Sequence, residues 1–230
     1  MKKLFLKLST LFLFMSAPLQ SQDWPNFERY KAENEKIGLP TANENRVVFM
    51  GNSITQGWKD YGHPELFSDS TSYINRGIGG QTTPQMLVRF RADVIALKPK
   101  AVVILAGIND IAENTGPTTL KMIQDNIVSM VELAQANKIK VILSSILPAN
   151  KFPWRPSIYP ADKVIEMNIF LKDYAEKNNC IYLDYYTALV DDNKGMKAEY
   201  SEDGVHPTTA GYDIMTPLVI EAINKALLQE

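Results

Sequence analysis

The chain has 230 residues, of which 45% are hydrophobic and 22% are charged, and its formal net charge is −2 at pH 7. This composition is typical of a globular protein, and it excludes the fibrous and the intrinsically disordered classes. A slightly negative chain offers no broad basic field to a nucleic acid or to an anionic membrane. We therefore expect no nucleic-acid partner.

The first 22 residues have the pattern of a secretory signal peptide. Lys2 and Lys3 precede an apolar stretch at 4–15, and small and polar residues follow at 16–22. The apolar stretch is shorter than the roughly 20 residues that a membrane-spanning helix needs. A buried N-terminal helix is the alternative. We predict cleavage near Gln22, a periplasmic or secreted protein without stable membrane insertion, and a single domain at 23–230.

The mature chain alternates short apolar runs with amphipathic stretches. A polar segment at 23–44 carries Trp24, Phe27 and Tyr30 at near-helical spacing, which predicts a short helix. Strands are predicted at 47–50, 72–75, 101–105, 141–145 and 181–184, and helices at 84–97, 118–137, 161–178 and 208–229. This order predicts an α/β fold with a five-stranded parallel sheet covered on both faces, a flavodoxin-like three-layer α/β/α sandwich.

Polar and glycine residues follow the predicted strands, at the sheet edge where parallel α/β folds bind ligands. Ser53 follows the first strand, Gly79 and Gly80 follow the second, and residues 107–110 follow the third. A segment at 148–160, rich in proline and aromatic residues, follows the fourth. We expect this segment to be an active-site loop, because four strand ends converge there.

Ser53 lies in the run Gly51-Asn52-Ser53-Ile54-Thr55, where a hydroxyl can be displayed directly after a strand. The run is not the Gly-x-Ser-x-Gly elbow of α/β-hydrolases, because Thr55 stands where the second glycine would be. Taken alone, such a serine is more often a turn former or a helix cap than a nucleophile.

Asp203 precedes His206 by three residues, just before the last predicted helix. A carboxylate that accepts the Nδ1 proton of histidine leaves Nε2 free to take the proton of a serine hydroxyl. The alternative is an aspartate that caps the helix beside an exposed histidine.

Two further segments offer hydrogen-bond donors to the same edge. The Asn109 amide and the Gly80 N–H are candidate donors to an oxyanion, although an asparagine here can also be a simple turn residue and Asp110 can cap the next helix. The glycines at 77–80 begin like a dinucleotide-binding loop. Thr82 stands at the position of its third glycine, which argues against that interpretation.

These four ordered segments resemble the blocks of the SGNH hydrolase family, also called the GDSL-like lipases and acylhydrolases. The matching positions are Ser53, Gly80, Asn109, and Asp203 with His206. The resemblance implies a serine esterase that forms an acyl-enzyme through a Ser-His-Asp triad, with an oxyanion hole made by the N–H groups of Ser53 and Gly80 and the Asn109 amide. Two positions depart from the family pattern: the first block reads Gly-Asn-Ser-Ile, and Gln81 stands where many members have aspartate.

No metal or cofactor is expected. The chain has two histidines and a single cysteine, Cys180, so a zinc site is poorly supplied and an intramolecular disulfide is impossible. Cys180 lies in an apolar run, where a cysteine is more often a small buried hydrophobe than a nucleophile.

The substrate is open to several interpretations. Trp154, Tyr159 and Phe152 are candidates to stack on a sugar ring, and Arg155 is a candidate to meet a hydroxyl or a carboxylate; loop packing is the alternative for all four. Resemblance to carbohydrate acetylesterases and to acetylhydrolases of the platelet-activating-factor type implies short acyl esters, with a small-molecule or glycan substrate. A lysophospholipase or thioesterase, or an inactive carbohydrate-binding relative, are the alternatives. The oligomeric state and the roles of Trp58 and His63 stay open.

Overall fold

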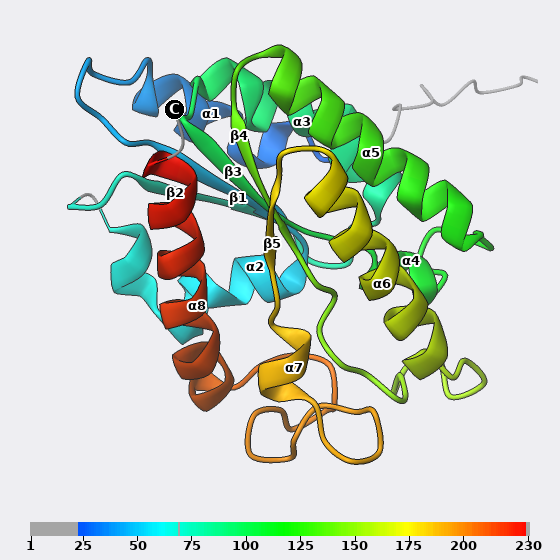
Figure 1. Cartoon of the computed structure of the whole chain (residues 1–230). Coiled ribbons are helices and arrows are strands. Elements are labelled where there is room, and N and C mark those ends of the chain that lie inside the picture. Colours follow the sequence, from blue (N-terminus) through cyan, green and yellow to red (C-terminus); the bar gives the residue numbers. More distant parts are fainter. Residues whose placement is uncertain (1–22, 69, 229–230) are drawn as a thin grey trace, which may run out of the picture.

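A parallel sheet of five strands lies at the centre of the fold, in the order β2-β1-β3-β4-β5 (Figure 1). The computed structural model describes residues 23–68 and 70–228. The strands are β1 (Val47–Gly51), β2 (Tyr73–Gly77), β3 (Ala101–Leu105), β4 (Lys140–Ser144) and β5 (Ile181–Leu183). The predicted α/β class and all five predicted strands are confirmed, with bounds that differ by at most two residues.

The central strands β1 and β3 are apolar throughout because both faces of the sheet are covered. Every residue of β1 and of β3 is buried, as expected of a parallel sheet between two helical layers. Gly51 at the end of β1 lies beside Gly77 of β2 and Leu105 of β3. The carboxyl ends of these three strands are therefore level, and the residues that follow them start from one edge.

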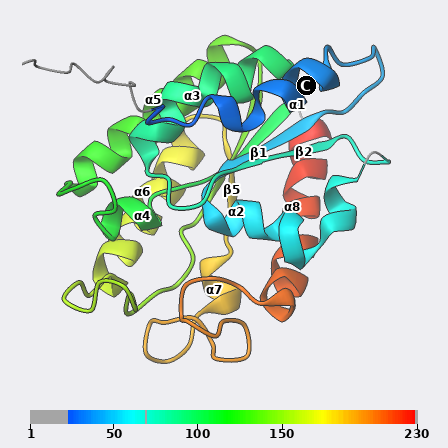
Figure 2. The same cartoon turned by 180° about the vertical axis from the view of Figure 1, so that it is seen from behind.

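Helices form a layer on each face of the sheet (Figures 1 and 2). They are α1 (Glu28–Ile37), α2 (Ser53–Gly57), α3 (Thr83–Asp93), α4 (Ile108–Ile111), α5 (Leu120–Ala136), α6 (Ala161–Lys177), α7 (Tyr186–Leu189) and α8 (Thr209–Leu228). Helices α3, α5 and α6 pack together on one side, and α8 packs on the other side against β3, β4 and β5. None of the described helices combines the length and the apolar character needed to cross a membrane.

Caps and backbone geometry explain where the observed helices differ from the predicted ones. Helix α5 begins at Leu120 because the Thr119 hydroxyl accepts the Met122 amide at 3.2 Å, as an N-cap does. The helix predicted at 84–97 ends at Asp93, since Val94 leaves the helical region (φ −124°, ψ −65°) and a short 3₁₀ turn completes the stretch.

The segment at 23–37 forms the predicted short helix, but only one of its three aromatic residues is buried. Tyr30 is 7% exposed, whereas Trp24 and Phe27 are more than 40% exposed. The Asp23 carboxylate accepts the Glu28 amide at 3.0 Å and so caps the start of α1, which lies beside α3 (Figure 2). The predicted signal peptide at 1–22 lies outside the described residues.

Candidate active site

The turn that carries Ser53 is held by its neighbours in the sequence and in the sheet. Ser53 is the first residue of α2, and the Asn52 side chain caps this helix by accepting the Ile54 amide at 3.0 Å. A Cβ on Gly51 would lie 2.0 Å from Thr55 Oγ1, and one on Gly77 would lie 2.2 Å from the Gln56 nitrogen. Glycine at both strand ends therefore lets the backbone of α2 lie directly against the edge of the sheet.

The structure brings the three predicted triad residues together. Ser53 Oγ lies 2.9 Å from His206 Nε2, and His206 Nδ1 lies 2.7 Å from Asp203 Oδ2. Asp203 Oδ1 accepts the backbone amides of Val205 and His206, each at 2.8 Å. The carboxylate thus fixes its own loop and the imidazole at once, and it does not cap α8, which begins at Thr209.

The environment of Asp203 favours its ionised form. Partial burial opposes ionisation, but hydrogen bonds from the His206 amide and ring and from the Val205 amide together outweigh it and lower the pKa of the carboxyl below its ordinary value. An ionised carboxylate at this position accepts the Nδ1 proton, which leaves Nε2 facing the Ser53 hydroxyl as a proton acceptor.

The candidate oxyanion donors lie at the ends of the neighbouring strands. Gly80 has a positive φ of 75°, and its amide donates no hydrogen bond to the described residues. The Ser53 amide is at the first position of α2, where a helix provides no partner. Asn109 is 5% exposed and donates one amide hydrogen to the Gln81 carbonyl at 3.0 Å, which leaves its second hydrogen for another acceptor.

The sequence allowed Asp110 to cap the helix that follows it, but the structure shows a different role. Its carboxylate accepts the Thr83 amide at 2.9 and 3.0 Å and the Thr83 hydroxyl at 2.6 Å, so it caps the start of α3 from α4. Burial outweighs these hydrogen bonds and raises the pKa of Asp110 to about 6. This buried contact ties the segment with Asn109 to the helix that follows Gly80.

The loop at 148–160 borders the triad through one aromatic residue. The Trp154 ring is 42% exposed and its centre lies 6.1 Å from that of the His206 ring. Its indole N–H donates to Asn114 Oδ1 at 3.4 Å. Phe152 is 1% exposed, and its ring centre lies 5.3 Å from that of Trp154. The prediction that Phe152 stacks on a sugar is therefore wrong, and its ring supports the Trp154 indole instead.

The other predicted contacts are farther from the reacting groups. The Arg155 guanidinium donates to the Glu113 carbonyl at 3.4 Å. Tyr159 is 80% exposed and forms no hydrogen bond or ring contact with the described residues. The structure therefore brings Trp154 to the triad, but not Tyr159.

Two residues near the nucleophile have structural partners. Trp58 is 1% exposed, stacks on Tyr212 of α8 at 5.4 Å and donates to the Thr216 hydroxyl. The two ring nitrogens of His63 lie 2.6 Å from Glu65 and 2.9 Å from Asp213. Both residues therefore tie the segment after α2 to α8.

Asn114 is a site residue that sequence reasoning missed. Its side-chain amide donates to the Gly80 carbonyl at 3.4 Å while its oxygen accepts from Trp154. The preceding residue, Glu113, has the left-handed φ of 56° that is uncommon outside glycine. The contact spans 34 residues of sequence, so no local pattern signals it.

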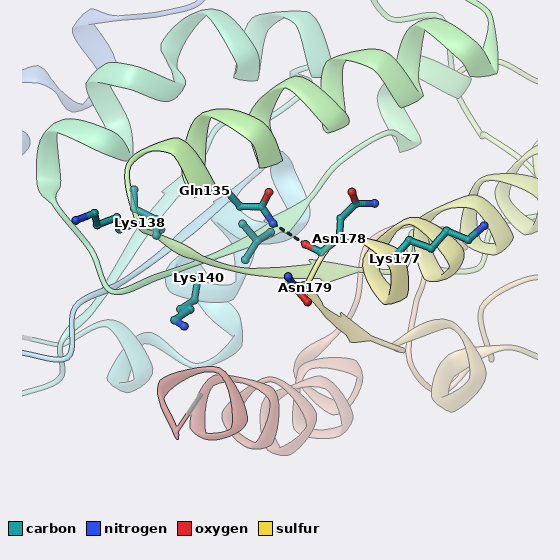
Figure 3. Close-up of a pocket in the computed structure, with 8 residues that line it drawn as sticks. Gln135, Lys138, Lys140, Lys177, Asn178 and Asn179 are labelled. Carbon is teal, nitrogen blue, oxygen red and sulfur yellow. Dashed lines mark hydrogen bonds between the residues drawn. The ribbon is translucent and has the colours of Figure 1, made fainter. Parts of the chain in front are cut away.

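Two surface hollows differ in their relation to the triad. One of about 390 Å³ lies beside His206 and is lined by Tyr61, Glu202, Asp203, His206, Pro207, Thr208 and Thr209. A larger one of about 490 Å³ lies where β4 begins, lined by lysines and amides and crossed by a hydrogen bond from Gln135 to the Asn178 carbonyl (Figure 3). None of the candidate active-site residues lines the larger hollow.

Comparisons with known proteins agree with this fold. The GDSL-like Lipase/Acylhydrolase family matches residues 49–214, and the chain belongs to this family. A structure of a putative acylhydrolase from Bacteroides fragilis is 54% identical, with a TM-score of 0.87 over 90% of this chain and 99% of that one.

Two curated relatives are named for their substrates. The human platelet-activating factor acetylhydrolase IB subunit alpha2 is 30% identical over 59% of this chain and 59% of its own length. The acetylxylan esterase of Xylanibacter ruminicola is 26% identical over 82% of this chain and 45% of its own length. The chain thus spans between about half and three-fifths of the length of these relatives.

Proposed function

We propose that the protein hydrolyses short-chain esters, in particular O-acetyl groups on carbohydrates, with Ser53 as the nucleophile. The observation that carries the proposal is the continuous hydrogen-bonded series from Ser53 Oγ through His206 to Asp203. Nucleophile, base and orienting carboxylate at these distances are the arrangement that activates a serine hydroxyl.

The reaction proceeds in two acyl transfers. His206 Nε2 takes the proton of Ser53 as Oγ attacks the ester carbonyl, and the bond to the leaving alcohol breaks as His206 returns the proton to it. Water then gives a proton to His206 and attacks the acyl-enzyme, which releases the acid and restores the Ser53 hydroxyl. The amides of Ser53 and Gly80 and the side chain of Asn109 stabilise the negative oxygen of each tetrahedral intermediate.

The surroundings of the triad favour a sugar as the leaving alcohol. The exposed Trp154 indole beside His206 is a flat apolar surface with a polar edge, which suits a pyranose ring. The hollow on the Asp203 side combines the apolar surfaces of Tyr61 and Pro207 with carboxylate and hydroxyl groups, and a sugar ring presents the same combination of apolar faces and polar edges. The acetylxylan relative supports the same substrate class.

The first experiment is hydrolysis of a chain-length series of p-nitrophenyl esters by the wild type and by folded Ser53→Ala. We expect activity that is highest on acetate and is abolished in the variant. Highest activity on long chains would favour a lysophospholipase or thioesterase. A protein that hydrolyses no ester and leaves Ser53 unlabelled by a fluorophosphonate would be an inactive binding relative.

Trp154→Ala tests the carbohydrate assignment separately. We expect a KM for acetylated xylo-oligosaccharides that rises about fivefold, because a lost stacking contact costs on the order of 1 kcal/mol. Hydrolysis of p-nitrophenyl acetate, which carries no sugar, should keep its kcat within twofold. An equal loss on both substrates would mean that Trp154 supports the triad and does not select the alcohol.

We also propose that the protein acts outside the cytoplasm, on the basis of the leader pattern at 1–22. Mass spectrometry of the protein recovered from a periplasmic or culture fraction should give a mature N-terminus near residue 22. Full-length protein confined to the cytoplasm would contradict this localisation.

A further inference from the structure

We propose that Gln81 is a positioning residue that fastens the loop carrying Gly80 to the N-terminal segment at 24–30. This inference rests on the proposed function, in which the Gly80 amide stabilises the oxyanion. It assigns to the first residues after the predicted leader a part in the chemistry, although they contribute no atom to the reacting centre.

Three polar groups of Gln81 form hydrogen bonds with residues outside its own turn. Its side-chain amide donates to the Pro25 carbonyl at 2.7 Å, and its side-chain oxygen accepts Arg89 Nε at 2.6 Å. Its backbone carbonyl accepts the Asn109 amide at 3.0 Å. Gln81 is 3% exposed, so a lost partner would leave a polar atom buried without compensation, which is costly.

Glutamine suits this position because the two partners need opposite roles. Arg89 donates and the Pro25 carbonyl accepts, so the side chain between them must be both acceptor and donor. An ionised carboxylate, as in the aspartate of many family members, only accepts and has no proton for the Pro25 carbonyl. Glutamine in place of the aspartate of many family members therefore fits the N-terminal segment, which presents the Pro25 carbonyl as an acceptor.

Arg89 extends the link to the strand that leads to the nucleophile. Its side chain is fully buried and pairs with Asp93 at 2.9 Å. It also donates to the Gly51 carbonyl at 3.1 Å and to the Arg76 carbonyl at 2.8 Å. The strand ends before Ser53 and before the Gly80 loop are therefore fixed to the same guanidinium that holds Gln81.

The N-terminal segment holds both ends of the loop. The Tyr30 hydroxyl donates to the carbonyl of Gly77, where β2 ends. The Gln85 side chain, in the first turn of α3 beyond the loop, donates to the Trp24 carbonyl at 2.8 Å. With the bond from Gln81 to Pro25 in the middle, three contacts brace the loop between Gly77 and α3 against this segment.

Two substitutions in the full chain each remove one hydrogen bond between the Gly80 loop and the N-terminal segment. Gln81→Glu keeps an acceptor for Arg89 and removes the donor to Pro25, and Tyr30→Phe removes one hydrogen bond with little change in packing. We expect each variant to lower kcat for p-nitrophenyl acetate at least about tenfold, with KM within twofold, because the oxyanion is stabilised only in the transition state. The double variant should lose less than the product of the two effects, since both residues hold one loop.

Gln135→Met is the matched control. Gln135 makes the same type of bond, from its side-chain amide to the Asn178 carbonyl at 2.6 Å (Figure 3). It lines the hollow where β4 begins, which none of the candidate active-site residues lines. This variant should keep the wild-type kcat. The ¹⁵N order parameter of the Gly80 amide is a readout independent of catalysis, and it should fall in Gln81→Glu and in Tyr30→Phe but not in Gln135→Met.

Wild-type kcat and an unchanged Gly80 order parameter in folded Gln81→Glu and Tyr30→Phe would overturn the inference. If Gln81→Glu fails to fold, Tyr30→Phe alone decides it by the same two measurements. A wild type that hydrolyses no ester, or an undiminished Ser53→Ala, would overturn the proposed function instead, and the order parameter would then decide whether Gln81 and Tyr30 hold the loop.

Discussion

The position of Asn109 is compatible with two roles, the observed bond to Gln81 and the proposed one in the oxyanion hole. One amide hydrogen holds the Gln81 carbonyl at 3.0 Å, and the other is free for a developing oxyanion. The side chain is 5% exposed, so water competes little for the second hydrogen. A donor fixed in this way loses little freedom when the transition state forms, which is the condition for strong electrostatic stabilisation.

Asn109→Ala should therefore lower kcat by about 10²-fold or more, since removal of one oxyanion donor costs about 3 kcal/mol in other hydrolases. Steady-state kinetics on p-nitrophenyl acetate, with circular dichroism to verify the fold, measures the effect. Asn178→Ala, at the far edge of the sheet, is the control. An unchanged kcat in folded Asn109→Ala would remove this residue from the oxyanion hole.

At the scale of single residues, the sequence predicts which groups lie together but not how exposed each one is. Ser53, Asp203 and His206 are predicted as a triad from the ordered segments that follow the strands and from the resemblance of these segments to the family blocks, and the three side chains do lie within hydrogen-bond distance. Phe152 and Trp154 looked equivalent in the sequence, yet one is buried and the other faces His206. Burial depends on distant segments, and the neighbouring residues do not encode it.

The contact of α2 with the end of β2 depends on the absence of a side chain at Gly77. An added Cβ would meet backbone atoms of Asn52, Thr55 and Gln56 at 2.2 to 2.8 Å, and backbone cannot move aside as a flexible side chain can. A change at the end of one strand therefore displaces the helix that begins at Ser53.

Gly77→Ala should lower the free energy of unfolding by about 3 kcal/mol, at the upper end of the usual cost of overpacking. Urea denaturation of the purified variants measures this quantity. Gly79→Ala is the matched control two residues along, since its Cβ would make only ordinary contacts at 3.5 Å or more, and it should cost less than about 1 kcal/mol. Equal stability of the two variants would show that α2 can shift to make room.

The contact between α3 and α4 gives stability a pH dependence. The pKa of Asp110 is raised to about 6 in the folded chain, above about 3.9 in an unfolded one. Between these values the folded state binds more protons, so the contribution of this group to stability falls as the pH rises from about 4 to 6 and is constant above.

Asp110→Asn removes this titration while keeping an acceptor for the Thr83 amide. The stability of the wild type relative to the variant should fall by about 2 kcal/mol between pH 4 and pH 7. Urea unfolding of both proteins at several pH values gives the difference. A difference that stays constant over this range would show that Asp110 is ionised throughout.

For the molecule as a whole, the fold was predictable because most strands are short runs rich in apolar residues and every connection is long enough for a helix. The alternation at 47–183 therefore gave the parallel sheet without any knowledge of contacts. The N-terminal segment was predicted as a helix, but its bonds to the Gly80 loop were not. Those bonds end at the backbone carbonyls of Trp24 and Pro25. Every residue has a backbone carbonyl, so no sequence pattern marks these two.

The stability of the whole chain should not depend on redox conditions. Cys180 is the only cysteine, so no intramolecular disulfide forms, and burial raises the pKa of its thiol to about 11. Calorimetry should give the same unfolding midpoint with and without dithiothreitol. A higher midpoint without the reductant would indicate disulfide-linked dimers, which non-reducing electrophoresis would detect.

The distance in sequence between Ser53 and His206, 153 residues, also determines when the proposed catalytic pair can form. Tyr212 of α8 donates its hydroxyl to the Ile54 carbonyl at 2.7 Å, so in the folded chain the last helix is docked on the turn that carries Ser53. A ribosome adds Ser53 to the chain long before it adds His206. Under the proposed mechanism, the growing polypeptide therefore lacks the base for Ser53 during most of its synthesis, and ester hydrolysis requires the completed tertiary structure.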